Sequence, residues 1–229
     1  MATFRKSTGR EYFESIVIAV ILALFIRTFV VQAFKIPTGS MENNLLVGDH
    51  LLVNKFIFAP TATELERRLL PIDPIRRGDV VVFKYPEDPA RDFIKRVIGL
   101  PGETLEIRAK KVYINGEPLD EPYVHFLSPP SGSSASYDVR ERYGPVVVPA
   151  DHYFVMGDNR DNSQDSRWWG FLPRHYIKGQ ALMVYWSYEA DETLSSPSEG
   201  ALGRLRDAAA FVVRFFTRTR WSRLFHQIR

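Results

Sequence analysis

The sequence predicts a mainly β protein, an antiparallel β-sheet domain with an N-terminal transmembrane helix and a short C-terminal amphipathic helix. Three patterns carry this prediction: an apolar run near the N-terminus, a series of short β-prone segments separated by turn residues, and an arginine-rich tail. Strands do not alternate with long helices, so a parallel nucleotide-binding sheet is not expected. With 45% hydrophobic residues in a chain of 229, a folded domain with a real core is expected and wholesale disorder is excluded.

The first element is the apolar run Ser15–Phe34, which reads SIVIAVILALFIRTFVVQAF. It is about the length that a helix needs to cross the hydrocarbon layer of a membrane. Arg27 weakens the pattern near mid-bilayer, although an arginine closer to the far interface can snorkel to water. Because Arg5, Lys6 and Arg10 precede the run, the positive-inside rule places the N-terminus in the cytoplasm. A cleavable signal peptide and a buried core helix are the competing interpretations, but no small-x-small cleavage site follows.

Short β-prone segments follow the anchor and are separated by turn signals. Arg77-Gly78-Asp79 and Leu100-Pro101-Gly102 are two of these signals, and Asn115-Gly116 is typical of a two-residue type I′ hairpin. We therefore expect antiparallel strands joined by tight turns. The expected strands are Asp49–Lys55, Asp79–Tyr85, Asp92–Ile98, Thr104–Arg108, Lys111–Ile114 and His152–Met156.

Composition divides the chain into five parts. Two excursions interrupt the β domain, at about 59–77 and 116–145. The first includes an expected helix, Thr61–Leu70, and the second a stretch rich in Pro, Ser and Gly around Ser128–Ser136. The parts are a cytoplasmic N-terminus (1–13), the transmembrane anchor (14–34), a periplasmic β domain (35–190), a polar linker (191–200) and a basic amphipathic helix (201–229).

The basic character of the chain belongs to its tail. Residues 201–229 contain seven arginines and one aspartate, which is +6, whereas the whole chain carries +3. Charge alone does not distinguish nucleic acid from an anionic membrane as the partner. The apolar positions Leu205, Ala209, Val212 and Phe216 fall at helical intervals on one side, as in a helix that lies on a membrane surface. A helix packed on the body is the alternative.

Ser40 is a candidate nucleophile. It lies in Pro37-Thr38-Gly39-Ser40-Met41, where proline and glycine fix an unusual backbone path just before a hydroxyl. A nucleophilic serine needs a base and hydrogen-bond donors for the developing oxyanion. On its own, the segment is more typical of an ordinary turn.

Lys95 is the candidate base. Strand alternation places it on the same face as Phe93 and Val97, so its amine is expected to lose hydration. Loss of hydration disfavours the charged form and lowers the pKa, as a general base at neutral pH requires. A lysine that snorkels from a strand edge is the alternative. Cysteine is absent, which excludes a thiolate nucleophile, and the histidines lie in no recognisable catalytic setting.

The polar run 157–167 is the third feature. Its alternating acidic and hydroxyl side chains resemble an EF-hand calcium loop, but Ser166 stands where that loop needs glycine and Leu172 where it needs glutamate. A buried hydrogen-bonding network with Asp165 and Arg167 as a charge pair fits better, and no metal is expected.

Together these segments closely resemble the bacterial type I signal peptidases, membrane serine proteases that remove signal peptides from exported proteins. The resemblance runs from the anchor to about Glu189. It rests on four motifs in the right order and spacing: Gly39-Ser40-Met41, Arg77–Phe83, Phe93–Gly102 and Gly157–Arg167.

The resemblance implies roles for individual residues. Ser40 would attack the scissile carbonyl and Lys95 would act as the base, without metal or cofactor. The Thr38 hydroxyl and the Ser40 backbone N–H would form the oxyanion hole. The remaining matched positions would support this dyad: Ser163 by orienting the lysine, and Asp165 with Arg167 as a structural ion pair.

Small pockets for the −1 and −3 residues of the signal peptide would give the Ala-x-Ala specificity. One departure is that Asn43 stands where many members carry proline, which leaves the rigidity of the Ser40 turn open. The pockets are expected to draw on Phe34, Ile36, Pro37, Met41, Leu45, Leu51, Val82, Phe93 and Ile94.

We therefore expect a single-pass protein of the bacterial inner membrane with its catalytic domain on the periplasmic or outer face. Its partners would be preprotein signal peptides and the phospholipid membrane, and not nucleic acid or metal. A self-cleaving Ser/Lys regulator is one alternative, but it would need DNA-binding helices where this chain has its apolar run. A non-catalytic tethered β module is the other, and it predicts that Ser40 and Lys95 lie far apart.

Overall fold

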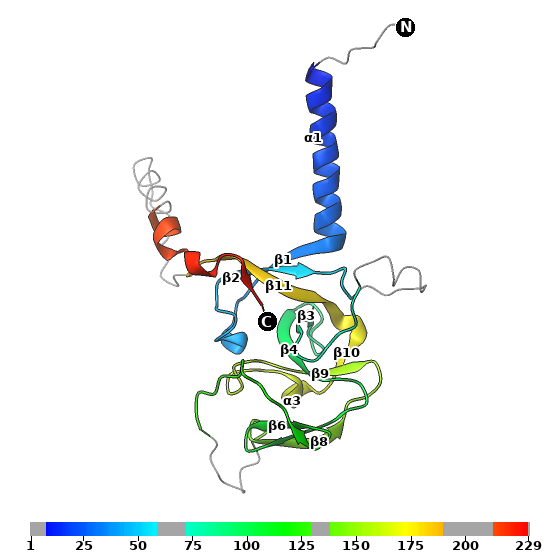
Figure 1. The fold of residues 1–229 in the computed structure, drawn as a ribbon, viewed down its shortest axis with the longest axis vertical. Coiled ribbons are helices and arrows are strands. Elements are labelled where there is room, and N and C mark those ends of the chain that lie inside the picture. The colour runs from blue at the N-terminus through cyan, green and yellow to red at the C-terminus, as the bar shows by residue number, and fades with distance from the viewer. Residues whose placement is uncertain (1–7, 59–71, 130–137, 190–212, 229) are drawn as a thin grey trace.

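The structure is a computed structural model that describes residues 8–58, 72–129, 138–189 and 213–228 (Figure 1). The expected helix Thr61–Leu70, the linker 191–200 and most of the Ser128–Ser136 stretch lie outside the described residues. The helices and strands that are described confirm a mainly β architecture with an apolar N-terminal helix.

The N-terminal anchor is helix α1 (Thr8–Phe25), continued by a π-helical turn (Ile26–Val30). Together they form an apolar helix long enough to cross a membrane, and none of its most apolar window is buried within the described part of the chain. In Figure 1, α1 stands away from the body. The prediction that the anchor continues to Phe34 was wrong, because Val31–Lys35 form strand β1 and pair with the sheet.

The main sheet is antiparallel and has the strand order β1-β2-β11-β3-β4-β9-β10, with β12 paired to β11. It carries the site, because β4 lies inside the sheet between β3 and β9. The strands other than β1 are β2 (Asp49–Asn54), β3 (Val80–Lys84), β4 (Asp92–Gly99), β9 (His152–Met156), β10 (Leu172–Pro173), β11 (Ile177–Ser187) and β12 (His226–Gln227).

A second antiparallel sheet lies at the end of the body far from α1 (Figure 1). Its order is β7-β6-β5-β8. The expected type I′ hairpin joins β6 to β7, since Asn115 and Gly116 both have positive φ, of 54° and 87°. The strands are β5 (Thr104–Arg108), β6 (Lys111–Ile114), β7 (Glu117–Pro118) and β8 (Arg142–Val147).

The helical elements of the body are short. Helix α3 (Ser166–Trp169) begins within the last residues of the polar run, and single 3-10 turns form at Gly39–Met41, Arg174–Tyr176 and Trp221–Arg223. The expected basic helix over 201–229 is corrected in its described part, which is α-helical only over residues 213–218 and adds a single 3-10 turn at Trp221–Arg223. Beyond that point the backbone bonds to the sheet instead, as β12 does with β11.

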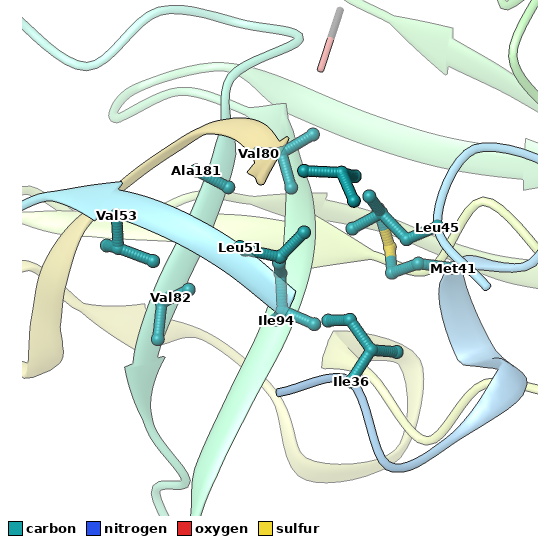
Figure 2. Close-up of a cluster of buried hydrophobic side chains, with 10 residues drawn as sticks. Ile36, Met41, Leu45, Leu51, Val53, Val80, Val82, Ile94 and Ala181 are labelled. Atoms are coloured by element: carbon teal, nitrogen blue, oxygen red, sulfur yellow. The ribbon is translucent and has the colours of Figure 1, made fainter. Parts of the chain in front are cut away.

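A buried hydrophobic cluster fastens the segment around Ser40 to the main sheet. Figure 2 shows Met41 and Leu45, on either side of the turn that follows Ser40, packed toward Leu51 of β2 and Ile94 of β4. Met41, Leu45 and Leu51 are completely buried. Burying one such side chain contributes roughly 1.5–3 kcal/mol, so this cluster determines where the Ser40 turn lies.

Leu45→Ala should therefore lower the stability of the folded chain by about 2–5 kcal/mol, because it removes a side chain from a packed core and leaves a cavity. Thermal or denaturant unfolding of the purified variant measures this. Leu127→Ala is the matched control, since Leu127 is 64% exposed and its loss should change stability by less than about 0.5 kcal/mol. Equal effects of the two substitutions would contradict the packing described here.

Candidate active site

Ser40 and Lys95 meet in the interior. Ser40 lies on the 3-10 turn Gly39–Met41 and Lys95 on β4, and both side chains are buried. The Lys95 Nζ donates a hydrogen bond of 2.7 Å to the Ser40 Oγ and one of 2.9 Å to the Ile94 carbonyl oxygen. The non-catalytic alternative required these side chains to lie apart, and the geometry speaks against it.

The surroundings of Lys95 favour its neutral form. The pKa of Lys95 is lowered from 10.5 to about 8, chiefly by burial; the carboxylates of Asp165 and Asp158 oppose the shift, and the charge of Arg167 adds to it. The amine also lies 5.3 Å from the centre of the Phe93 ring, on the face predicted from strand alternation. A neutral amine at hydrogen-bond distance from a hydroxyl can accept its proton.

The polar run holds the Ser40 turn from the other side. The Asn159 backbone N–H donates to the Ser40 carbonyl oxygen, and its side-chain Nδ2 donates to the Gly39 carbonyl oxygen, both at 3.2 Å. At Gly157 the two segments come so close that an added Cβ would lie 2.4 Å from the Ser40 carbonyl oxygen and 2.3 Å from the Ser163 Oγ. Only glycine fits at this position.

Asp165 and Arg167 form the ion pair that the sequence predicts. The Arg167 Nε and Nη2 donate to the two Asp165 oxygens at 2.8 Å each, and both side chains are fully buried. Asp165 also accepts from the Gly157 N–H at 3.1 Å and caps α3. Burial alone would raise the pKa of Asp165, but the hydrogen bonds and charge of Arg167 hold it below its usual range.

A second buried ion pair was missed by the sequence reasoning. The Arg96 Nε and Nη2 donate to the Asp158 oxygens at 2.8 and 2.6 Å, with both side chains 1% exposed. The guanidinium also stacks 4.0 Å from the Tyr123 ring centre. The signal was an arginine inside an apolar strand, because a buried charge requires a partner, but the sequence did not identify which acidic residue supplies it.

Comparison with known proteins identifies the family. The family model described as "Signal peptidase, peptidase S26" matches residues 9–186 of this chain. The chain belongs to this family. It is therefore an enzyme, a serine endopeptidase of the signal peptidase I type, and the fold expected from the resemblance is confirmed.

Relatives from several bacteria match most of the chain. Signal peptidase I of Pseudomonas aeruginosa is 36% identical, with 84% of this chain and 78% of the relative covered. Signal peptidase I of Leptolyngbya laminosa is 42% identical, with 77% and 79% covered. A crystal structure of a signal peptidase I from Enterococcus faecalis matches with 35% identity and a TM-score of 0.39, covering 48% of this chain and 97% of that one.

Two of the support residues expected from the signal peptidase resemblance are adjacent to the dyad without bonding to it. Ser163 is buried, and among the described residues its Oγ has no hydrogen-bond partner, although it is near enough to Asp165 to favour that carboxylate's charged form. Thr38 is exposed on extended backbone directly before the turn, and its side chain does not cap that turn. Their roles stay predictions.

Most of the residues expected to line the signal peptidase substrate pockets lie in one buried hydrophobic cluster. Phe34 packs on the cluster of Figure 2 from outside, Phe93 stacks on Tyr85 with ring centres 4.3 Å apart, and Pro37 is exposed. Their contact with a substrate stays a prediction. The six that are buried in the cluster are Ile36, Met41, Leu45, Leu51, Val82 and Ile94.

Gly157→Ala should reduce cleavage of a signal-peptide precursor by roughly 100-fold or more, because the new Cβ displaces the Ser40 carbonyl and with it the hydroxyl. Gly9→Ala is the matched control, since nothing lies within 4 Å of the position where its Cβ would be. Steady-state cleavage by the two variants measures the difference. Normal cleavage by Gly157→Ala would show that the close approach at Gly157 does not fix Ser40.

Proposed function

We propose that this enzyme cleaves signal peptides from exported preproteins after small residues, with Ser40 as nucleophile and Lys95 as general base. The observation that carries the proposal is the 2.7 Å hydrogen bond between two buried side chains that lie 55 residues apart in the sequence. Membership of the signal peptidase family supports the reaction class. No cofactor or metal enters the proposed reaction.

The proposed chemistry begins with the neutral Lys95 amine. It takes the Ser40 proton as the Oγ attacks the scissile carbonyl, and the C=O electron pair moves onto the oxygen. The Ser40 N–H and the Thr38 hydroxyl would stabilise that oxyanion. The Lys95 ammonium then gives its proton to the leaving amine as the C–N bond breaks, and the acyl-enzyme remains. Lys95 next takes a proton from water as the water oxygen attacks the ester carbon. The bond between that carbon and the Ser40 Oγ then breaks, the Oγ takes the proton back from Lys95, and the signal peptide leaves.

The lowered pKa makes lysine adequate as this base. With a pKa of about 8, roughly a tenth of the side chain is neutral at pH 7, whereas at the ordinary value of 10.5 the neutral fraction would be smaller by more than a hundredfold. Because burial lowers its pKa, the lysine can act as the base that a histidine usually supplies to a catalytic serine.

We propose that α1 anchors the enzyme in the bacterial inner membrane with the catalytic body on the outer face. Only β1 and one turn separate the end of the apolar helix, at Val30, from Ser40. The nucleophile would therefore be held near the membrane surface, where the cleavage site of a signal peptide emerges from the bilayer. The arginines and lysine before the span support this orientation.

Ser40→Ala and Lys95→Met should each reduce cleavage of a purified precursor by about 1,000-fold or more while the fold is kept. Each removes one half of the proton-transfer pair. Lys111→Met is the control, because Lys111 is exposed on β6 and should leave cleavage unchanged. Full activity in either dyad variant would overturn the assignment.

The rate of cleavage should rise with pH through about 8, as Lys95 loses its proton. Its folded pKa lies below the unfolded value, so between about pH 8 and 10.5 the unfolded chain binds more protons and folding gains stability as pH rises. Lys95→Met should lack this gain. The melting temperature of the wild-type protein should therefore rise relative to that of Lys95→Met between about pH 8 and 10, and a constant difference would contradict the lowered pKa.

A further inference from the structure

Lys110 is a buried lysine that the proposed dyad does not use. It lies in the turn between β5 and β6 of the second sheet and is only 6% exposed. Its Nζ donates to the Asp161 Oδ1 at 2.8 Å, to the Ser128 carbonyl oxygen at 2.8 Å and to the Ser128 Oγ at 3.1 Å. These bonds use all three protons of the ammonium group, so the cation is fully paired although it is buried.

Asp161 joins this lysine to the polar run that holds the Ser40 turn. While its Oδ1 accepts from Lys110, its Oδ2 accepts from the backbone N–H groups of Leu127 and Ser128 at 2.9 and 3.0 Å. Burial would raise the pKa of Asp161, but the hydrogen bonds from Lys110 and from these N–H groups hold it below its usual range. The charged carboxylate therefore ties the end of the segment 121–128, which we call the strap, to the polar run.

The strap runs beside the residue that holds the Ser40 turn. His125 forms a short parallel β-bridge with Asn159. The His125 N–H donates to the Asp158 carbonyl oxygen at 2.8 Å, and the Arg160 N–H donates to the His125 carbonyl oxygen at 3.0 Å. These two bonds bracket Asn159, which itself donates two hydrogen bonds to the Ser40 turn. A shift of the strap would therefore be passed on to the nucleophile.

A second ion pair fastens the other end of the strap. The Arg160 Nη1 donates to the Glu121 Oε2 at 3.0 Å, its Nη2 donates to the Oε1, and the two side chains are 2% and 9% exposed. The Arg160 Nε also donates to the Gly157 carbonyl oxygen at 3.2 Å. The strap is thus fixed to the polar run at both ends by buried charges. Because Lys110 belongs to the second sheet, that sheet supports the strap and, through it, the polar run.

We propose that Lys110 and Asp161 are positioning residues for the reaction: they hold the strap against the polar run, so that Asn159 keeps the Ser40 hydroxyl within reach of the Lys95 amine. In the described part of the chain neither bonds to the dyad, so both act through Asn159. Without the pair, the 2.7 Å hydrogen bond of the dyad would lengthen. A displacement of about 1 Å can cost on the order of 100-fold in rate. This inference rests on the proposed dyad.

The effect should fall on the rate of the chemical step and not on substrate binding. Most of the residues expected to bind the signal peptide belong to the cluster of Figure 2, and none of them lies in the strap. The charges that act on Lys95 are those of Asp165, Asp158 and Arg167. Lys110→Met in the full chain should therefore lower kcat by at least about tenfold, leave KM within about twofold, and keep the midpoint of the pH–rate profile near 8.

A variant that only destabilises the second sheet separates positioning from stability. Ile107 lies in β5 and is 1% exposed, so Ile107→Val removes a buried methyl group from that sheet and leaves the ion pair in place. Melting curves identify a temperature at which each variant is folded, and cleavage is measured there. Ile107→Val should keep its kcat. An equally unchanged kcat in folded Lys110→Met would overturn the proposal.

Asp161→Asn is the milder variant, because it keeps the volume of the side chain and removes its charge. It should lower kcat in the same way, and it decides the question if Lys110→Met does not fold. A normal kcat in folded Asp161→Asn would contradict the positioning role.

The absence of cysteine permits a test of the ammonium group itself. Lys110 lines a groove of about 750 Å³ together with Leu119, Phe126 and Ser128, which gives a small reagent access to this position. Lys110→Cys is alkylated with 2-bromoethylamine: the sulfur forms a bond to the reagent's carbon as bromide leaves, and the product has the length and charge of lysine. Alkylation with 1-bromopropane gives a neutral side chain of the same length. Mass spectrometry verifies a single adduct in each case.

The charged adduct should restore kcat to within about threefold of the original enzyme, whereas the neutral adduct should leave it low. Equal kcat with both adducts would show that the side chain acts through its volume alone, and would overturn the proposal.

The failure of this proposal is distinct from the failure of the dyad. Full activity of Lys110→Met beside an inactive Ser40→Ala refutes only the positioning role. Cleavage by Ser40→Ala refutes the dyad, and the positioning role falls with it.

Discussion

The site depends on the exclusion of water from around the Lys95 amine. An ammonium ion in this position would lose nearly all its hydration, so burial is the largest influence on its pKa. Two nearby carboxylates, Asp158 and Asp165, act in the opposite direction. Each has its own buried guanidinium, Arg96 and Arg167, at hydrogen-bond distance. Both carboxylates are therefore neutralised by a guanidinium. An unpaired carboxylate beside Lys95 would stabilise its ammonium form and raise its pKa.

The second requirement is a fixed position for Ser40. Asn43, which replaces the proline expected from the resemblance, has a φ of 90°, and proline cannot adopt that angle because its ring holds φ near −65°. The backbone here follows a path that excludes proline. Rigidity comes from contacts instead: Met41 and Leu45 are anchored in the core, and Asn159 bonds to the turn. Packing and hydrogen bonds, and not a proline, therefore hold the Ser40 turn in place.

Local patterns in the sequence were sufficient for much of the fold. The strands β5, β6 and β9 and the hairpin at Asn115-Gly116 follow alternation and turn residues, and their predicted bounds match. Strand β11 was missed because bulges interrupt its register with both β2 and β3, which breaks the alternation. The end of the anchor was misplaced because Val31, Ala33 and Phe34 of β1 continue the apolar run of the helix. Only pairing with β2, a tertiary contact, makes them a strand.

The site was likewise predicted where local patterns mark its residues, and missed where only tertiary contacts do. Ser40, Lys95, Asp165 and Arg167 were found because motifs and strand faces mark them, and the structure brings them together. The Arg96 partner lies 62 residues away, a distance over which no local pattern operates. The tail was predicted as one helix because spacing alone cannot show that its last residues bond to β11.

A base held at a membrane surface must also resist the field of that surface. An anionic bilayer with a potential of about −30 mV concentrates protons and raises the apparent pKa of a nearby group by roughly half a unit. Burial changes the pKa of Lys95 in the other direction, from 10.5 to about 8. The local effect is several times larger, and the buried amine is also shielded from the surface by protein. With the proposed anchor, Ser40 and Lys95 can therefore lie close to anionic lipid while the packing around β4 keeps the pKa of Lys95 low.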